Sequence, residues 1–210
     1  MTWTPAKSLQ RSVDSILVPG IVVVCRRIAQ GDENALWPEE LPAFAGSVVK
    51  VRRASGAARI AARDLMQNLG LPPAAIVKSA AGVPIWPEGI VGSLAHDAEV
   101  AVAALAKRQT FASLGIDVEP AEPLAEDLID IVVSRAERRW IEDGLHQARL
   151  LFSIKEAVYK AVYPLDGVFL DHHDVEIDLP AGLAQVKSGR TVDFRYCVDK
   201  HIVTLAFIRT

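Results

Sequence analysis

Each half of this 210-residue chain contains one segment whose apolar residues recur with the period of an α-helix. In the first half the pattern covers residues 58–69, and Gly70 followed by Pro72 is a typical stop signal. In the second half it covers residues 150–163, where Pro164 is expected to end the helix. We therefore predict one amphipathic helix in each half of the chain.

Short apolar runs rich in β-branched residues predict strands around both helices. The predicted strands are residues 21–24, 100–105, 114–119, 174–178, 191–198 and 202–208. The second and third of them are joined by a link short enough for an antiparallel pair. A further short helix is predicted at residues 134–141. The predicted fold class is α+β, with two subdomains of similar size, residues 1–108 and 109–210.

The charge balance and the few cysteines argue against several classes of protein. Lys and Arg total 23 against 26 Asp and Glu, a net charge of −3, which disfavours a globally basic nucleic-acid-binding protein. Cys25 and Cys197 lie far apart in apolar runs, so a secreted disulfide scaffold is not expected. The longest apolar stretch, residues 16–25, is interrupted by Pro19-Gly20 and is too short to span a membrane. We expect a soluble, cytoplasmic protein.

An acidic pair lies on one predicted strand. Alternate side chains of a strand share a face, so Asp117 and Glu119 should point to the same side. Two carboxylates with this spacing suit Mg²⁺, which binds carboxylates together with phosphate oxygens. An exposed face of an edge strand would show the same pattern, and Asp-x-Glu alone favours that plainer interpretation.

The second predicted helix carries Glu156 and Lys160 one turn apart, with Tyr159 beside them. Taken alone, this pair is best explained as a surface ion pair worth about 0.3–0.5 kcal/mol. The alternative makes Glu156 a third metal ligand and Lys160 a group that contacts phosphate or transfers a proton.

His96 follows Gly92 and Ser93 in a segment predicted to be a loop at the entry to a strand. Exposed backbone N–H groups in such a loop, together with an imidazolium, could hold a phosphate. A lone histidine is more often structural. We interpret the neighbouring pair His172-His173 as structural or surface residues, because adjacent side chains point apart.

Basic residues are concentrated in a short stretch of a chain that is acidic overall. They are Lys50, Arg52, Arg53, Arg59 and Arg63. Arg59 and Arg63 are four residues apart, so their guanidinium groups can point to one spot. Most such clusters are solvated helix faces. Placed opposite a metal site, however, they would suit a polyphosphate ligand.

Three segments, taken in order, resemble the 4′-phosphopantetheinyl transferases, in particular the larger, monomeric branch with the enterobactin- and surfactin-type enzymes. The segments are Gly92-Ser93-Leu94-Ala95-His96, then Gly115-Ile116-Asp117-Val118-Glu119, then Phe152-Ser153-Ile154-Lys155-Glu156-Ala157-Val158-Tyr159-Lys160. Trp86-Pro87-x-Gly89 precedes them, as is typical of the enterobactin-type members. The resemblance is close over residues 50–164 and loose in the flanks.

The resemblance implies a pseudo-dimer of two similar α/β subdomains with the active site in the cleft between them. Such enzymes move the phosphopantetheine arm of coenzyme A to a serine of an apo acyl or peptidyl carrier protein and release 3′,5′-ADP. The expected partners are therefore coenzyme A and a carrier protein, with no nucleic acid and no membrane, and the expected state is a monomer. Siderophore or other secondary metabolism is slightly favoured.

The resemblance also implies roles for individual residues. Asp117, Glu119 and Glu156 would hold Mg²⁺, and Lys160 would contact the phosphate under attack, supported by Lys155 from the same helix. The expected contacts to coenzyme A are His96 and Arg59 at its 3′-phosphate, with Arg63, Arg52 and Ser93 as helpers. The attacking hydroxyl must lose its proton, for which Glu156 and a metal-bound water are both candidates.

The sequence departs from the family pattern at three places. Ala95 stands where a serine is common, Gly82 where a basic residue is usual, and Ala58 precedes Arg59 where a glycine is common. Lys78 could replace the missing basic residue. These departures affect the expected grip on coenzyme A rather than the acidic residues. A Mg²⁺-dependent nucleotide phosphohydrolase and a non-catalytic coenzyme A or carrier-protein binding module remain the alternatives.

Overall fold

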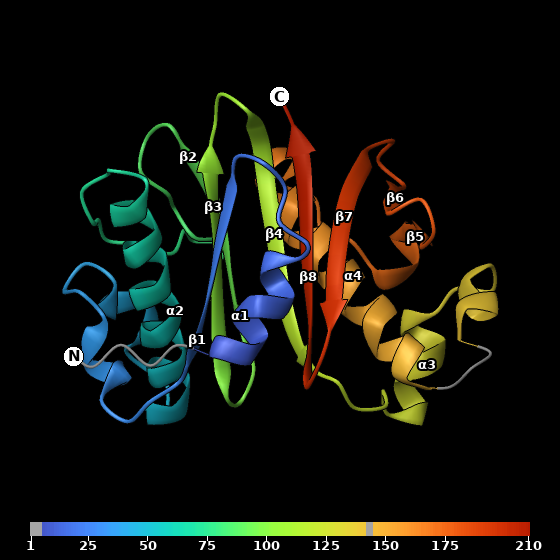
Figure 1. The fold of residues 1–210 in the computed structure, drawn as a ribbon, viewed down its shortest axis with the longest axis horizontal. Helices are drawn as coiled ribbons and strands as arrows, with labels where there is room; N and C mark the ends of the chain where they lie inside the picture. The colour runs from blue at the N-terminus through green and yellow to red at the C-terminus, as the bar shows by residue number, and fades with distance from the viewer. Residues whose placement is uncertain (1–5, 142–144) are drawn as a thin grey trace.

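The computed structural model describes residues 6–141 and 145–210, which form two antiparallel sheets (Figure 1). The first sheet has three strands in the order β1 (Ile21–Arg27), β3 (Val100–Lys107), β2 (Ile90–His96). The second has five strands in the order β4 (Phe111–Pro120), β8 (His201–Arg209), β7 (Thr191–Val198), β6 (Leu183–Val186), β5 (Val175–Asp178). The α+β pseudo-dimer expected from the sequence is thus the observed fold.

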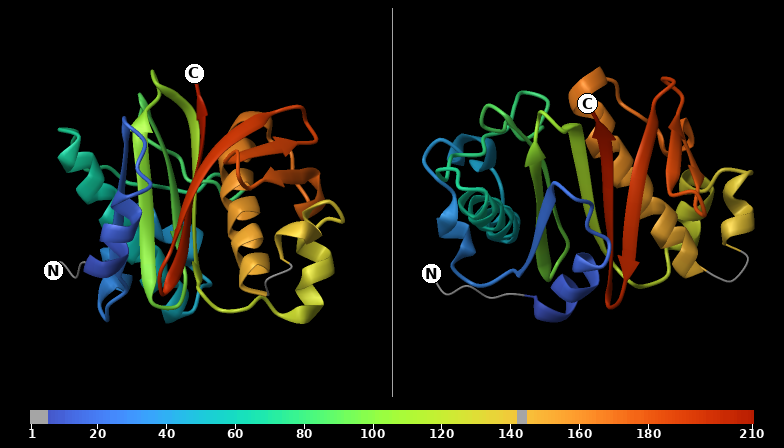
Figure 2. Two further views of the ribbon diagram at one scale, coloured as in Figure 1. Left: turned by 45° about the vertical axis from the view of Figure 1, so that its right-hand side comes forward. Right: turned by 45° about the horizontal axis from the view of Figure 1, so that its top comes forward.

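One long helix packs against each sheet, and both are visible in Figure 1. Helix α2 (Val49–Asn68) packs on the first sheet and α4 (Leu145–Asp166) on the second. The short α1 (Lys7–Asp14) lies on the opposite side, where the two sheets share a hydrophobic core (Figure 2). Helix α3 (Glu126–Val132) packs near the amino-terminal part of α4. The remaining helical elements are the 3₁₀ turns η1 (Asp32–Ala35), η2 (Leu41–Phe44), η3 (Glu137–Trp140) and η4 (His172–Asp174).

The side chains of strand β3 explain why helix α2 lies close to the first sheet. Its alternate residues face opposite sides, with Val102 and Ala104 in the shared core and Ala103 and Leu105 against α2. Helix α2 also presents small residues to the strand, such as Ala61. Small side chains on both surfaces let the helix pack tightly on the sheet.

The predicted pairing of residues 100–105 with 114–119 was wrong, because β3 and β4 belong to different sheets. Both edges of β3 are already hydrogen-bonded, one to β1 and one to β2. Strand β4 therefore pairs with β8, which comes from the far end of the chain. The segment with Gly92 and Ser93 is also not a loop, since both residues lie in β2 and pair with β3.

Helix boundaries differ from the predicted ones at several points. Helix α2 begins at Val49, before the apolar pattern starts. Its first residues are largely exposed, so they do not show the apolar period of the buried part. Helix α4 continues past Pro164 to Asp166, and Gly167, with φ of 64°, donates its N–H to the carbonyl of Tyr163 and ends it. The helix predicted at residues 134–141 is only the short turn η3, preceded by α3. Helix α1 and strand β6 were not predicted.

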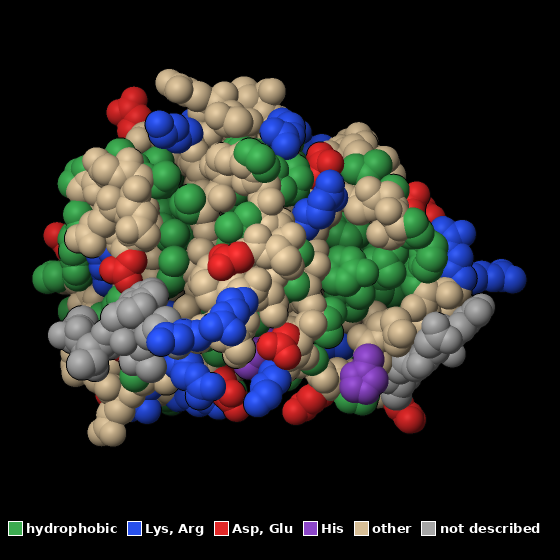
Figure 3. All heavy atoms as spheres, in the orientation of Figure 1, with side chains coloured by type: hydrophobic (Ala, Val, Ile, Leu, Met, Phe, Trp, Pro, Cys, Tyr) green, Lys and Arg blue, Asp and Glu red, His purple; other side chains and the backbone are tan. Residues whose placement is uncertain are grey.

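Surface charge is mixed on the face drawn in Figure 3, where Lys and Arg side chains lie among Asp and Glu side chains along the lower edge. Within the described residues, the structure contains no helix that is both long and apolar enough to cross a membrane.

Candidate active site

A cavity of about 790 Å³ lies between the two subdomains and is lined by residues of both. The first subdomain contributes Ser55 and Arg59 from α2, Ser93 and His96 from β2, and the segment with Lys78 and Trp86; the second contributes Ser113 from β4 and Tyr159, Lys160 and Tyr163 from α4. The sequence placed basic and acidic groups far apart in the chain. The fold brings the basic groups to this cavity together with Lys160, which is hydrogen-bonded to the acidic residue Asp117 behind the lining.

Arg59 lies in the wall of this cavity and is only 2% exposed. Its Nε donates to the carbonyl of Ile76 at 3.0 Å and its Nη1 to the carbonyl of Ser55 at 3.3 Å. Among the described residues its Nη2 has no hydrogen-bond partner. A buried guanidinium nitrogen without a partner is costly, so it is available for an anionic ligand in the cavity.

Arg63 was expected to help Arg59, and both guanidinium groups do converge on the carboxylate of Glu40. Oε1 of Glu40 is 3.5 Å from Nε of Arg59 and 3.0 Å from Nη1 of Arg63. Nη2 of Arg63 also donates to the carbonyl of Ala35 at 2.6 Å. Arg63 is not among the residues that line the cavity. Its expected contact with coenzyme A is therefore a misassignment, because its donors are directed at the protein.

Arg52, the other expected helper, lies in the first turns of α2 and is not part of the cavity lining either. Lys78 does line the cavity, as does Gly82, the position without the usual basic residue. The Lys78 ammonium lies 4.8 Å from the centre of the Phe44 ring, and the Arg59 guanidinium lies 4.9 Å from the same ring. Burial, and secondarily the nearby charge of Arg59, lower the pKa of Lys78. Lys78 and Arg59 thus form one basic end of the cavity.

His96 lies at the end of β2 on the side of the cavity that approaches the second subdomain. Its partial burial lowers its pKa, as do the positive charges of Lys160 and Lys78. Ser93 is buried three residues earlier and also lines the cavity. Both residues are held in position by the pairing of β2 with β3 rather than by a loop.

Gly115 allows α4 to lie directly against β4. A Cβ atom at this position would stand 1.8 Å from the carbonyl oxygen of Ala157. Because the helix approaches so closely, Nζ of Lys160 reaches Asp117 Oδ1 at 2.7 Å and the carbonyl of Ile116 at 3.2 Å. The acidic strand and the Glu156–Lys160 helix are thereby brought together, as the resemblance implies.

Asp117 is 5% exposed, and its Oδ2 has no hydrogen-bond partner within the described part of the chain. Burial raises the pKa of its carboxyl group, while Lys160 opposes that effect. Glu119 accepts a hydrogen bond from Nη1 of Arg149 at 2.9 Å, and burial, together with the charge of Asp117, raises its pKa to about 6. The carboxylates of β4 are therefore close enough to affect each other's charge.

Glu156 completes the predicted trio from α4. Its Oε1 lies 3.5 Å from Nε2 of His172, and this imidazole lowers the pKa of Glu156. Phe152 stacks on the His172 ring, with centroids 5.5 Å apart, and keeps it beside the carboxylate. In residues 6–141 and 145–210 no three acidic, histidine or cysteine side chains are arranged closely enough to hold a metal ion as they stand. Glu119 is turned toward the guanidinium group of Arg149 and Glu156 toward the imidazole of His172 instead.

The donor set nevertheless fits a Mg²⁺ ion. Asp117, Glu119 and Glu156 supply the hard oxygen ligands that this ion prefers. The buried Oδ2 of Asp117, which lacks a partner among the described residues, is the kind of atom that a cation would satisfy.

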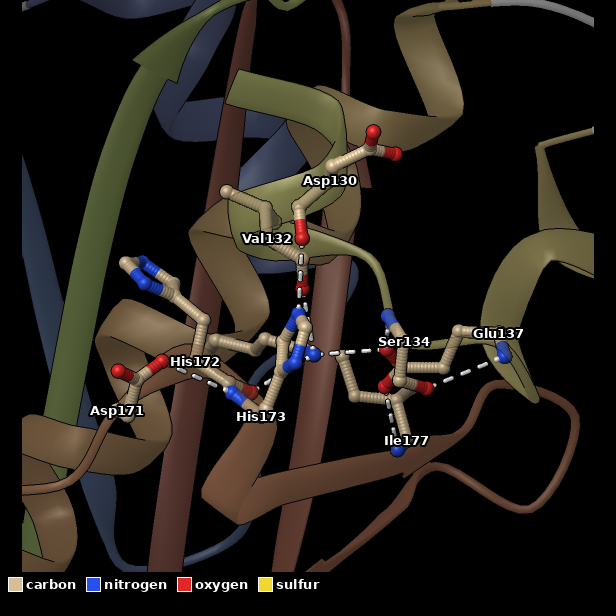
Figure 4. Close-up of polar contacts among 9 residues, drawn as sticks. Asp130, Val132, Ser134, Glu137, Asp171, His172, His173 and Ile177 are labelled. Carbon is tan, nitrogen blue, oxygen red and sulfur yellow. Dashed lines mark hydrogen bonds and ion pairs between the residues drawn. The ribbon is translucent and has the colours of Figure 1, made fainter. Parts of the chain in front are cut away.

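Lys155 was expected to take part in catalysis, and the structure contradicts this. The side chain is 2% exposed, and its Nζ donates to the carbonyls of Val132 at 2.7 Å and His172 at 2.9 Å and to Glu137 at 2.7 Å. In Figure 4 the three acceptors, Val132, His172 and Glu137, lie around one point beside η4. An ammonium group has three N–H donors, and all three are used here. Lys155 therefore holds the segment with His172 in place and does not face the cavity.

Sequence reasoning missed three residues around the site: Glu40, Arg149 and His172. Glu40 and Arg149 are single charged residues whose partners lie far away in the chain. His172 was interpreted as a structural or surface residue, and its contact with Glu156 was not predicted. No local pattern marks such residues, because their role is set by long-range contacts.

Comparisons with known proteins show the family of this chain. Residues 38–106 match the model of the 4′-phosphopantetheinyl transferase N-terminal domain, and residues 113–206 match that of the 4′-phosphopantetheinyl transferase superfamily. The 4′-phosphopantetheinyl transferase Npt of Nocardia iowensis is 43% identical over 73% of this chain and 73% of its own. Svp of Streptomyces mobaraensis is 40% identical over 69% of this chain and 61% of its own. PptT of Mycobacterium tuberculosis is 42% identical over 67% of this chain and 63% of its own.

More distant relatives are also found. Enterobactin synthase component D of Salmonella typhimurium is 31% identical over 50% of this chain and 45% of its own. A solved structure, the holo-[acyl-carrier-protein] synthase of Thermotoga maritima, is 20% identical over 45% of this chain and 61% of its own, with a TM-score of 0.33, too low to support an inference. From the two family models and the similarity to Npt, this chain belongs to the 4′-phosphopantetheinyl transferase family.

Proposed function

We propose that this protein transfers the 4′-phosphopantetheine arm of coenzyme A to a serine of an apo carrier protein and releases 3′,5′-ADP. One observation carries the proposal: a single cavity joins the basic group of Arg59 and Lys78 to Lys160, which is hydrogen-bonded to the buried Asp117. Basic side chains suit the terminal phosphate of coenzyme A, and the acidic residues suit a metal at its diphosphate. Because one chain supplies both sides of the cavity, we expect it to act as a monomer.

Each end of the cavity would have a separate task. The free Nη2 of Arg59, with Lys78 and His96 on the same cavity, would bind the 3′-phosphate and orient the nucleotide. Binding energy gained there holds the diphosphate in register with the acidic residues. Lys160 would contact the phosphate under attack, since its Nζ lies between Asp117 and the cavity.

Asp117, Glu119 and Glu156 would hold Mg²⁺. Such an ion supplies positive charge at the diphosphate, where negative charge develops during transfer. Glu156 is kept ionised by His172, which lowers its pKa, so it is suited to bind a cation. The acceptor serine must give up its proton in this region. A carboxylate that holds the metal is not free to accept that proton, so Glu156 is assigned to the metal here.

The natural acceptor would be an acidic acyl or peptidyl carrier protein. Charge complementarity would then set the association rate and the choice of partner more than the affinity. The similarity to enterobactin synthase component D favours a carrier of siderophore or other secondary metabolism.

The test is intact-mass spectrometry of apo acyl and peptidyl carrier proteins incubated with this protein, coenzyme A and Mg²⁺. We expect each accepted carrier to gain one phosphopantetheine group. The gain should vanish with EDTA, or when the acceptor serine of the carrier is replaced by alanine. Breakdown of coenzyme A without a carrier would identify a phosphohydrolase instead, and binding of coenzyme A with neither reaction would identify a binding module.

Arg59→Ala should raise the KM for coenzyme A about tenfold or more and change kcat only a few fold. The reason is that the 3′-phosphate lies away from the reacting atoms, so its loss of contact weakens substrate and transition state alike. Steady-state kinetics with varied coenzyme A measure the effect.

Arg53→Ala is the matched control, because Arg53 lies on the same helix, pairs with Glu33 at 2.8 Å and does not line the cavity. Its KM should equal that of the wild-type protein. An unchanged KM in Arg59→Ala would show that the 3′-phosphate binds elsewhere.

A further inference from the structure

Glu40 is the most completely buried carboxylate near the cavity, with 0% of its surface exposed. Its Oε1 accepts from Nη1 of Arg63 at 3.0 Å and from the backbone N–H of Ile76 at 2.7 Å. Its Oε2 accepts from the backbone N–H of Trp37 at 2.8 Å. A charge that is wholly removed from water survives in a fold only with such a full set of donors.

The partners of Glu40 come from three separate parts of the first subdomain. Arg59 and Arg63 lie on α2, Trp37 precedes η2, and Ile76 belongs to the segment that leads to Lys78. The carbonyl of Ile76 also accepts from Nε of Arg59, so both ends of this residue's backbone are tied to the same cluster. Glu40 thereby joins the helix that carries Arg59 to the segment that carries Lys78.

Charge counting shows why an acidic group is needed at this point. Arg59 and Arg63 are 2% and 7% exposed, so two positive charges are buried side by side. One carboxylate neutralises one of them and leaves a net positive charge on the cluster. Because the donors of Arg63 are taken up by Glu40 and the carbonyl of Ala35, Arg59 is the member with a nitrogen left for the cavity.

Glu40 also lies at the amino-terminal edge of η2, whose Phe44 ring is the surface under both cavity cations. Moving η2 would therefore move the ring against which Arg59 and Lys78 rest. The contacts of the Glu40 carboxylate with backbone and side-chain donors thus help to fix the positions of Arg59 and Lys78.

We propose that Glu40 is a positioning residue that aims Arg59 and Lys78 at the 3′-phosphate of coenzyme A and so selects coenzyme A over its 3′-dephospho form. This inference rests on the proposed function, since it takes coenzyme A as the ligand of the cavity. Glu40 touches no substrate atom itself. Its effect is exerted through the two cations.

The experiment compares Glu40→Gln with the wild-type protein, using coenzyme A and 3′-dephospho-coenzyme A as alternative substrates. Glutamine keeps the size of the side chain but removes its charge and one acceptor. We expect the ratio of kcat/KM for the two substrates to fall about tenfold in the variant, through the KM for coenzyme A, with activity toward the dephospho form nearly unchanged. This ratio does not depend on how much of the variant is folded.

Asp32→Asn is the matched control, because Asp32 is also a buried carboxylate of the first subdomain and pairs with a buried arginine, Arg26. It does not line the cavity, so its substrate ratio should stay at the wild-type value even where its melting temperature falls. Glu40→Asp, which keeps the charge but withdraws it by one methylene group, provides the measurement if Glu40→Gln does not fold. Its ratio should fall about threefold.

An unchanged ratio in Glu40→Gln, or an equal change in Asp32→Asn, would overturn the inference and leave Glu40 with a purely structural role. A wild-type protein that transfers nothing from either substrate would instead contradict the proposed function. In that case calorimetric binding of coenzyme A and its dephospho form to the same variants still tests Glu40. Equal losses of affinity for both ligands would then count against it.

Discussion

Asp117→Asn is expected to reduce phosphopantetheine transfer about a thousandfold while the protein stays folded. The substitution keeps the volume of a side chain that is 5% exposed. It removes the negative charge that binds Nζ of Lys160 at 2.7 Å and that would help to hold the metal. Removal of a group that stabilises developing charge costs roughly 10²–10³ in kcat. Asp117→Asn loses both the contact with Lys160 and a ligand of the metal, so we expect a value at the upper end of this range.

Stability should survive this substitution for a physical reason. Burial raises the pKa of Asp117, which shows that the ionised carboxylate is held there at an energetic cost. A neutral amide does not carry that desolvation cost. The energy saved in this way offsets the energy lost with the ion pair to the half-buried Lys160. Initial rates by intact-mass spectrometry, together with thermal unfolding of each variant, measure the two effects separately.

Asp130→Asn serves as the control, because the Asp130 side chain on α3 is 82% exposed, pairs with Arg138 of η3 and lies outside the cavity. It should transfer at the wild-type rate. Glu156→Ala is expected to reduce transfer by a factor similar to that of Asp117→Asn. More than a tenth of wild-type activity in both Asp117→Asn and Glu156→Ala would remove the metal site from this mechanism.

Gly115→Ala should lower the free energy of unfolding by about 3 kcal/mol or more and should also depress activity. The added Cβ would stand 1.8 Å from the carbonyl oxygen of Ala157, and 2.8 Å from the backbone nitrogen of Ala161. Both atoms belong to the backbone of α4 and cannot rotate away. The helix must therefore move off β4, and Lys160 and Glu156 move with it relative to Asp117.

Denaturant unfolding of Gly115→Ala and Gly46→Ala gives the comparison. A Cβ at Gly46 meets nothing within 4 Å, so that substitution should change stability by less than about 0.5 kcal/mol. If Gly115→Ala were as stable as the wild-type protein, α4 would not lie as close to β4 as described. In that case the contact between Lys160 and Asp117 would need another explanation.

Much of the fold could be predicted from local pattern. Periods of 3.6 and 2 residues marked the two long helices and most of the strands, because these periods arise from which face of an element is buried. Element ends were less predictable. Helix α4 passes Pro164, since a proline in the last turn removes a single helical hydrogen bond and Gly167 then supplies the stop.

The site was only partly accessible to the same reasoning. Asp117, Glu156 and Lys160 could be predicted as site residues because their spacing on a strand and a helix gives them a common direction. Lys155 lies on that same helix, yet its donors are used up by Val132, His172 and Glu137, which are remote in sequence. Local spacing cannot tell an ammonium group that faces a cavity from one that closes a buried network.

The sequence by itself determined the two long helices, most strands, the order of the three motifs and hence the family of the chain. Only the tertiary structure decided that β4 pairs with β8 and that Arg59, not Arg63, keeps a nitrogen for the cavity. The physical reason is common to both results. Hydrogen-bond donors and acceptors are limited in number, and which of them remain free depends on partners that distant segments bring to the same place.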